Sequence, residues 1–291
     1  MESILVITAL LLIAALSISS ASILVLLSKA DALGCVFWRL SITSLLLTSY
    51  ASIQCRELFK RIACNRQLLK VSALSGFALF THFALWIESL FYIPVSYSTT
   101  IVVTYPMQLI LLDATLGEAP NKKQVVGIVC GFSFLLLLLT QGVFESLNLR
   151  GVLCSLLAST AASAYFGIGR IVRRRGLSVL EYAIPTYGFA SLIALLYALI
   201  IGRNLLNYTL HSYAFFTLMS LAPMIGGHTV INYLLKYLKS STATSIALIE
   251  PIGASILAYL LIGQEVSIVS AILMIMVVAS TCLVVLSEES G

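Results

Sequence analysis

The sequence predicts an all-α membrane protein with ten transmembrane helices, arranged as two inverted five-helix repeats. Three observations support this prediction: an apolar composition, ten long apolar runs and an internal sequence repeat. Hydrophobic residues make up 60% of the 291 residues and charged residues 10%, and the mean hydropathy is +1.04. Soluble domains contain about 25% charged residues. The composition therefore excludes a water-soluble globular protein.

Ten apolar runs follow one another along the chain, joined by connections too short to fold alone. Each is close to the ~20 residues that a helix needs to cross the hydrocarbon core. The first is expected to be a retained helix, because Glu2 stands where a signal peptide has basic residues. Prolines and acidic residues interrupt the fourth and ninth runs. The expected spans are 4–27, 33–53, 70–91, 96–117, 123–141, 149–171, 179–201, 213–237, 241–262 and 266–286.

The basic residues predict the direction of the chain. With the N-terminus in the cytosol, thirteen of the 17 Lys and Arg residues fall on the cytosolic side and four on the other. This matches the positive-inside rule, so we expect a multi-pass plasma-membrane protein with both termini in the cytosol. The net charge of +5 does not indicate nucleic-acid binding, because the basic residues lie in short loops between apolar runs. The lipid bilayer is the expected partner.

Two segments of the chain resemble each other. One runs from His82 to Pro106 and the other from His228 to Pro251. From Tyr92 and Tyr237 onward the spacing is identical, and Tyr, Ser, Ile and Pro recur at the same intervals. We therefore expect two five-helix units, 1–141 and 149–286. Because five is odd, the second unit enters the membrane upside down. An inverted repeat provides two near-equivalent conformations, as alternating access requires.

Several short motifs resemble the drug/metabolite transporter superfamily, specifically its ten-helix EamA-type members. The first half has Phe-Trp-Arg at 37–39, the stretch 92–106, and Leu-Gly-Glu at 116–118. The second half has Gly-His-Thr at 227–229, Tyr-Leu at 237–238, and the stretch 250–265. The halves differ, since Pro106 to Glu118 is two residues shorter than Pro251 to Glu265. The resemblance implies a carrier of small polar metabolites, often an exporter of amino acids, with no single substrate.

Ionisable residues inside a bilayer are costly and are therefore candidates for function. His82 and His228 lie in the middle of the third and eighth expected spans, and the repeat predicts that they face each other. Either they contact substrate or protons, or each only hydrogen-bonds a neighbouring helix. Glu250 is the expected proton-coupling residue. Its structural alternative is an ion pair with Lys236 or a contact with a histidine.

The two mid-span prolines, Pro106 and Pro251, are expected to kink their helices. A proline cannot donate a backbone N–H, and its ring crowds the carbonyl four residues earlier. For Pro251 that carbonyl belongs to Ala247. In the repeat alignment Tyr105 occupies the position of Glu250, so the two halves contribute different charge.

Aromatic, amide and guanidinium groups complete the expected substrate site. Trp86 and Asn232 lie four residues after the histidines, hence on the same helical faces. Arg39 either clamps a carboxylate or phosphate or extends to the outer lipid headgroups. Aromatic walls with few polar groups suit an amphipathic ligand. Further aromatic candidates are Tyr105, Tyr165 and Tyr187.

These features favour a secondary active transporter that alternates access and can be coupled to protons, and the resemblance implies an exporter. The alternatives are an intramembrane enzyme that uses His82, His228 and Glu250, or a passive channel or facilitator. No cofactor or metal is expected, since the histidines lack carboxylate spacing and no ATP-binding motif occurs. The six scattered cysteines are expected to be free thiols. The sequence leaves a monomer and a homodimer equally open.

Overall fold

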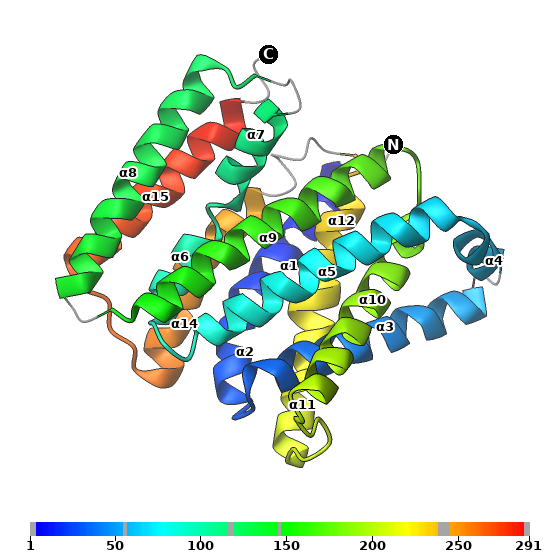
Figure 1. Ribbon diagram of the computed structural model, residues 1–291. Coiled ribbons are helices and arrows are strands. Elements are labelled where there is room, and N and C mark those ends of the chain that lie inside the picture. The colour runs from blue at the N-terminus through cyan, green and yellow to red at the C-terminus, as the bar shows by residue number, and fades with distance from the viewer. Residues whose placement is uncertain (1–3, 55–56, 116–118, 145–146, 238–244, 288–291) are drawn as a thin grey trace.

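The computed structural model describes residues 4–54, 57–115, 119–144, 147–237 and 245–287. In these residues the chain is entirely helical and has no β-strand. Figure 1 shows long helices packed at varied tilts around a common centre. In chain order the helices are α1 (Ile4–Ser19), α2 (Ala21–Leu27), α3 (Ala32–Gln54), α4 (Glu57–Cys64), α5 (Arg66–Ser89), α6 (Val95–Val102), α7 (Tyr105–Thr115), α8 (Lys122–Phe144), α9 (Leu149–Arg174), α10 (Val179–Ile200), α11 (Leu210–Met219), η1 (Ser220–Thr229), α12 (Val230–Leu234), η2 (Ser245–Ile249), α14 (Glu250–Ile262) and α15 (Ile268–Ser287).

Eight helical stretches in the described residues are long and apolar enough to cross a membrane. They correspond to all the expected spans except the fourth and the ninth. The ninth appears as a shorter apolar stretch, Ile246–Ile262. The fourth is divided into α6 and α7. Large apolar side chains such as Leu199 and Ile200 point outward, at 67% and 82% exposure, as lipid-facing surfaces require.

Helices of the first half of the chain pack against helices of the second half in matching pairs. The third span of the first half, α5, packs against α9, the first span of the second half. In the same way α1, the first span, packs against η1 in the eighth. The two second spans, α3 and α10, pack on each other, and so do the two fifth spans, α8 and α15. This is the pattern that a two-fold relation between five-helix units produces. The predicted all-α fold of two inverted repeats is confirmed.

The fourth and ninth spans both change their helical geometry just before a proline. Helix α7 begins at Tyr105 and α14 at Glu250, so that Pro106 and Pro251 are each the second residue of an α-helical segment. In the fourth span a two-residue turn separates α6 from α7, so the helix expected to be kinked is interrupted there. In the ninth span the 3₁₀ helix η2 passes directly into α14. A proline in the first turn of an α-helix costs no α-helical hydrogen bond, because the first N–H groups have no intrahelical partner.

The eighth span contains a π-helical segment, η1, between α11 and α12. Pro223 lies inside this segment, and Thr229 Oγ1 donates to the Met224 carbonyl five residues earlier, at 3.0 Å. Such wide turns often occur at functional sites. The segment ends at His228 and Thr229, so it brings the second expected histidine toward the centre of the molecule.

The loop between the second and third spans contains a short helix, α4, which the sequence did not predict. Its apolar side chains Leu58 and Ile62 are buried, and its other face carries basic residues. Helix α5 then begins at Arg66, four residues before the expected start at 70. The Asn65 side chain accepts a hydrogen bond from the Leu68 N–H and so caps this earlier start.

Candidate functional site

A cavity lies where the two repeats meet. Its volume is about 30 Å³, which leaves room for about two water molecules in this conformation. A larger ligand therefore requires the lining to move apart. Both repeats contribute. The lining consists of Ile18, Ala21, Arg39, His82, Phe83, Trp86, Val102, Tyr105, Phe166, Pro223, His228, Ile231, Ala247 and Glu250.

Arg39 extends from α3 into this cavity and is fully buried, with 0% exposure. Its Cζ lies 4.0 Å from the centre of the Phe83 ring, a cation–π contact. Its Nη2 is 3.9 Å from the sulfur of Met224, while Nε and Nη1 have no hydrogen-bond partner in the described residues. The alternative in which Arg39 extends to lipid headgroups is therefore wrong. The guanidinium keeps donors available inside the cavity.

Glu250 contributes the opposite charge to the same cavity. It is the first residue of α14 and is only 8% exposed. No hydrogen bond or ion pair joins its carboxylate to any side chain of the described residues, and the Lys236 ammonium lies instead 5.7 Å from the centre of the Tyr237 ring. The charge of Arg39 acts on Glu250 across the cavity. Burial makes such separated charges costly unless a partner or water reaches them.

The two histidines lie beside each other on the cavity wall, with ring centres 6.1 Å apart. The Nδ1 of His82 is 3.0 Å from the Ala158 carbonyl. The corresponding atom of His228 has no partner in the described residues, and neither does Nε1 of Trp86. Phe166 stacks on His228 at 5.8 Å. A buried polar atom without a partner costs about 1–3 kcal/mol, so these atoms favour a polar ligand or water in the cavity.

Tyr105 also lines the cavity, and its ring stacks on Phe166 at 5.0 Å. Three other expected site residues, Tyr165, Tyr187 and Asn232, are not among the lining residues. They form a buried layer behind His228. The Asn232 amide donates to the Tyr165 hydroxyl at 2.6 Å and to the His228 carbonyl at 2.9 Å.

The third residue of this layer, Tyr187, completes the support from another helix. Its hydroxyl lies 3.1 Å from Thr229 Oγ1, next to His228 in the chain. The layer therefore fixes the position of the π-helical segment rather than contacting the cavity. Residue spacing along one helix could not distinguish residues that line the cavity from residues that support its wall.

Sequence reasoning missed two aromatic residues of the cavity, Phe83 and Phe166. Phe83 supports Arg39, and Phe166 stacks on both His228 and Tyr105. Each directly follows a residue that was singled out, His82 or Tyr165, but one-residue neighbours face different directions on a helix. Their roles depend on contacts between helices. In the described residues no three His, Cys, Asp or Glu side chains gather as metal ligands.

Comparisons with known proteins agree with this architecture. A sequence model of the EamA-like transporter family matches residues 3–140 and 149–286. A crystal structure of another protein has a similar fold, with a TM-score of 0.69 and 15% sequence identity, covering 98% of this chain and 99% of that one. Among curated proteins, none matches the chain. The chain belongs to the EamA-like transporter family, within the drug/metabolite transporter superfamily.

Proposed function

We propose that this protein is a secondary active transporter that exports a small polar or amphipathic metabolite by alternating access. The observation that carries the proposal is the cavity between the repeats, into which both repeats place buried ionisable side chains. Transporters with inverted repeats bind substrate at the repeat interface. Rearrangement of the repeats would open this cavity to each side of the membrane in turn.

The lining supports a substrate that carries an anionic group. Arg39, Trp86 and His228 present polar atoms without partners, and a carboxylate would satisfy several of them at once. Phe83 and Phe166 provide apolar walls. Glu250 is available to a positively charged group on the same ligand. An amino acid combines these features and is the substrate that we propose to test first.

Glu250 is the proposed proton-coupling residue. Its carboxylate is buried in the cavity and makes no hydrogen bond within the described residues, so no protein group holds it in one protonation state. When the cavity opens to one side, water can deliver or remove a proton there. A proton gradient would then drive the cycle without ATP.

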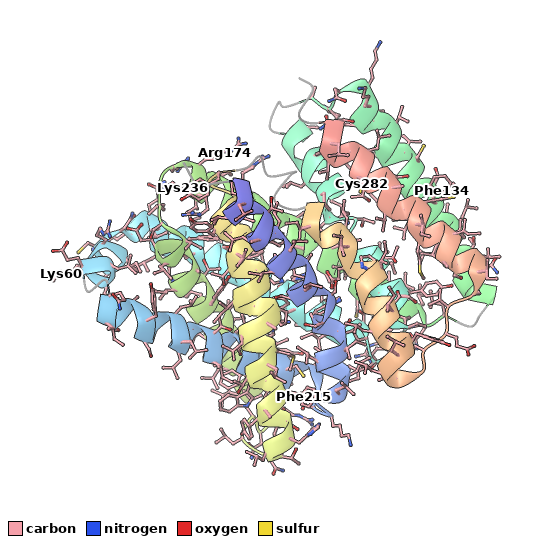
Figure 2. The ribbon with its side chains drawn as sticks, turned by 180° about the vertical axis from the view of Figure 1, so that it is seen from behind. Lys60, Phe134, Arg174, Phe215, Lys236 and Cys282 are labelled. Atoms are coloured by element: carbon pink, nitrogen blue, oxygen red, sulfur yellow. The ribbon has the colours of Figure 1, made fainter. Side chains whose placement is uncertain are left out.

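We propose a plasma-membrane location with both termini in the cytosol. Figure 2 shows the basic residues Arg174 and Lys236 at the end of the bundle opposite to Phe215, where the positive-inside rule favours the cytosol. Labelling of intact cells with a membrane-impermeant thiol reagent tests this orientation. The exposed thiol of Cys64 should be protected, and a Ser146→Cys variant should react. The reverse pattern would contradict the orientation.

Two other functions place different demands on the same residues. An intramembrane enzyme would use His82, His228 and Glu250 to change a solute chemically. A passive channel or facilitator would move a solute without response to pH. Membership of a transporter family favours transport over catalysis. The small volume of the cavity, about 30 Å³, favours a carrier over a continuously open pore.

Reconstitution into liposomes separates these three functions. The purified protein should move one or more solutes of an amino-acid, sugar and phosphorylated-metabolite panel unchanged, and an imposed pH gradient should drive accumulation. An Arg39→Gln variant provides the matched control: it removes the positive charge of the cavity but leaves its helices in place, and it should move the solute more slowly than the wild type. Chemically altered solute would support an enzyme, and equal rates with and without the gradient would support a facilitator. No movement of any solute would contradict the carrier.

A further inference from the structure

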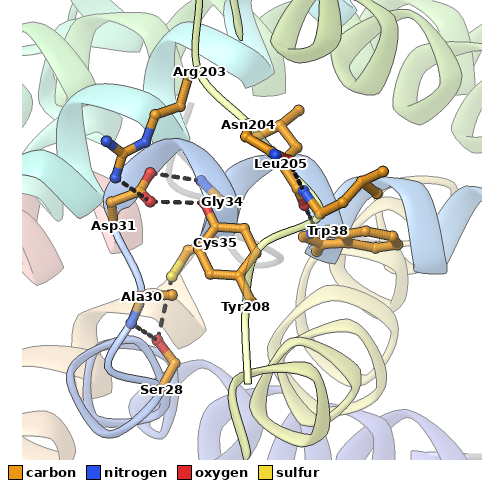
Figure 3. Close-up of polar contacts among 11 residues, drawn as sticks. Ser28, Ala30, Asp31, Gly34, Cys35, Trp38, Arg203, Asn204, Leu205 and Tyr208 are labelled. Atoms are coloured by element: carbon orange, nitrogen blue, oxygen red, sulfur yellow. Dashed lines mark hydrogen bonds and ion pairs between the residues drawn. The ribbon is translucent and has the colours of Figure 1, made fainter. Parts of the chain in front are cut away.

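A cluster of polar contacts joins the loop after α2 to the loop after α10 (Figure 3). Asp31 Oδ1 accepts a hydrogen bond from the Gly34 N–H at 3.0 Å and so caps α3. Its Oδ2 accepts hydrogen bonds from Arg203 Nη2 at 2.9 Å and from the Tyr208 hydroxyl at 2.7 Å. One carboxylate therefore fastens the start of α3 to the segment that follows α10.

The surroundings of Asp31 keep this carboxylate ionised. Partial burial acts to raise its pKa, but the hydrogen bonds from Tyr208 and Arg203 outweigh burial, and the net pKa is lowered. A second contact lies beside it, where Trp38 Nε1 of α3 donates to the Leu205 carbonyl at 2.7 Å. The start of α3 and the loop after α10 are thus joined at more than one point.

A second ion pair lies at the other end of the same two helices. Glu181 is in the first turn of α10, where it forms a capping box with Ser178. Its Oε2 accepts from the Ser178 N–H at 2.7 Å, and its Oε1 is 3.4 Å from Arg61 Nη1. Arg61 belongs to α4, the short helix that follows α3. This carboxylate fastens the start of α10 to the segment that follows α3.

The two ion pairs correspond under the relation between the repeats. In each, a carboxylate near the beginning of one second-span helix binds an arginine of the segment after the other. Helices α3 and α10 pack on each other in opposite directions. Helix α10 has 22 residues, or about 33 Å at 1.5 Å per residue. The two pairs are therefore near opposite faces of the membrane.

We propose that Asp31–Arg203 and Glu181–Arg61 are alternating latches, each of which closes one face of the transporter and opens when the cavity faces that side. The proposal rests on alternating access by the proposed carrier. With both pairs formed, α3 and α10 are fastened at both ends, and the cavity between the repeats has a volume of only about 30 Å³. Because the repeats are inverted, a conformation that breaks one pair has a counterpart that breaks the other.

The latches differ in strength. Asp31 binds both an arginine and a tyrosine, whereas Glu181 binds a single arginine. The arginine of each pair is more than half exposed, at 55% for Arg203 and 65% for Arg61, so water weakens both ion pairs. The hydrogen bond from Tyr208 is the additional contact of Asp31. The Asp31 latch should therefore be the stronger one, and the resting protein should favour opening on the Glu181 face.

Thiol labelling of the cavity tests the latches without a substrate. The labelled residue would be a cysteine at Ala21, which lines the cavity, in a protein whose six native cysteines are replaced. A membrane-impermeant maleimide is applied separately to right-side-out and inverted vesicles. Asp31→Asn keeps the helix cap but removes the charge, and Glu181→Gln keeps the capping box and also removes the charge.

The two substitutions should act in opposite directions. Asp31→Asn should raise the labelling rate from the Asp31 face about tenfold and lower it from the other face, since charged hydrogen bonds are lost. Glu181→Gln should do the reverse, by up to about fivefold, since an exposed pair is lost. Arg203→Gln should reproduce Asp31→Asn, and the double variant should show no larger effect than either single one.

Equal or parallel changes for the two carboxylate variants would overturn the proposal, because a purely structural role would alter both faces alike. Additive effects of Asp31→Asn and Arg203→Gln would also overturn it. The labelling readout does not depend on transport of any solute. Opposite labelling changes together with a silent solute panel would therefore retain the latches and reject only the proposed substrate class.

Discussion

Tyr105 and Glu250 occupy corresponding places in the two repeats but differ in chemistry. Each begins the second helix of a broken span, each is followed by proline, and each lines the central cavity. Tyr105 stacks on Phe166, whereas Glu250 brings a buried carboxylate with no hydrogen bond in the described residues. The repeat thus starts an α-helical segment at the cavity twice, and one side-chain difference gives it a charge in only one half.

Arg39 and its counterpart show the reverse difference. Counted from the helix caps Asp31 and Ser178, the position of Arg39 in α3 corresponds to Thr186 in α10. Thr186 is buried and neutral. The first repeat therefore supplies the positive charge of the cavity and the second supplies the negative one. Two inverted repeats can exchange their backbone conformations symmetrically, although the charges that they place in the shared site are not symmetric.

Among the variants that test this comparison, Glu250→Gln should have the largest effect on transport. Glutamine retains the size and hydrogen-bonding capacity of the side chain but cannot ionise, so we expect loss of pH-driven accumulation in proteoliposomes. Exchange of solute across the membrane in the absence of a gradient should persist. Tyr105→Phe is the matched control in the other repeat, and its pH response should equal that of the wild type. Normal pH-driven accumulation by the Gln variant would show that Glu250 is not the coupling residue.

Arg39→Gln should have the next largest effect, a loss of substrate affinity. Hydrogen bonds to a charged group contribute about 1.5–3 kcal/mol, which corresponds to a loss of roughly ten- to a hundredfold in apparent affinity for a carboxylate substrate. Thr186→Ala in the other repeat should change the affinity little. Concentration dependence of uptake gives both values. Equal losses for the two variants would mean that the charge asymmetry does not determine binding.

The overall fold follows from the sequence because bilayer thickness fixes the length of each apolar run, and loop charges fix their order across the membrane. The site was predicted only in part. His82, Trp86, His228 and Glu250 could be found because polar groups are rare inside apolar spans. The position of Phe83 beneath Arg39 could not, since it depends on how α3 and α5 meet.

The helix breaks show a further limit of sequence reasoning. The prolines were recognised, but a proline that kinks a helix and one that starts a helix have the same local sequence. The difference depends on the residues before the proline, which form a two-residue turn before Tyr105 and a 3₁₀ helix before Glu250. Likewise, α4 was missed because its apolar face has only two buried residues.

The histidines should respond differently to substitution, with smaller effects than Arg39. Both variants remove a buried ring, and since His228 Nδ1 has no partner in the described residues, His228→Ala should lower substrate affinity severalfold and cost stability through lost ring packing alone. His82 also lies 3.0 Å from the Ala158 carbonyl, so His82→Ala should cost about 0.5–1.5 kcal/mol more through the lost hydrogen bond. Uptake and thermal unfolding in detergent measure the two effects. Equal unfolding temperatures for the variants would contradict this distinction.

Pro106→Ala and Pro251→Ala should have the smallest effects, and the sign of each change in stability is informative. If a proline kinked a continuous helix, alanine would restore a hydrogen bond and stabilise the protein by about 3 kcal/mol. Both prolines instead lie in the first turn of α7 and α14, where they remove no intrahelical bond. Alanine there only adds freedom to the unfolded chain, so each variant should lose about 0.4–1 kcal/mol. Thermal unfolding in detergent should show a slightly lower midpoint for both. A raised midpoint in one variant alone would mean that its span is continuous and that the two repeats break their helices differently.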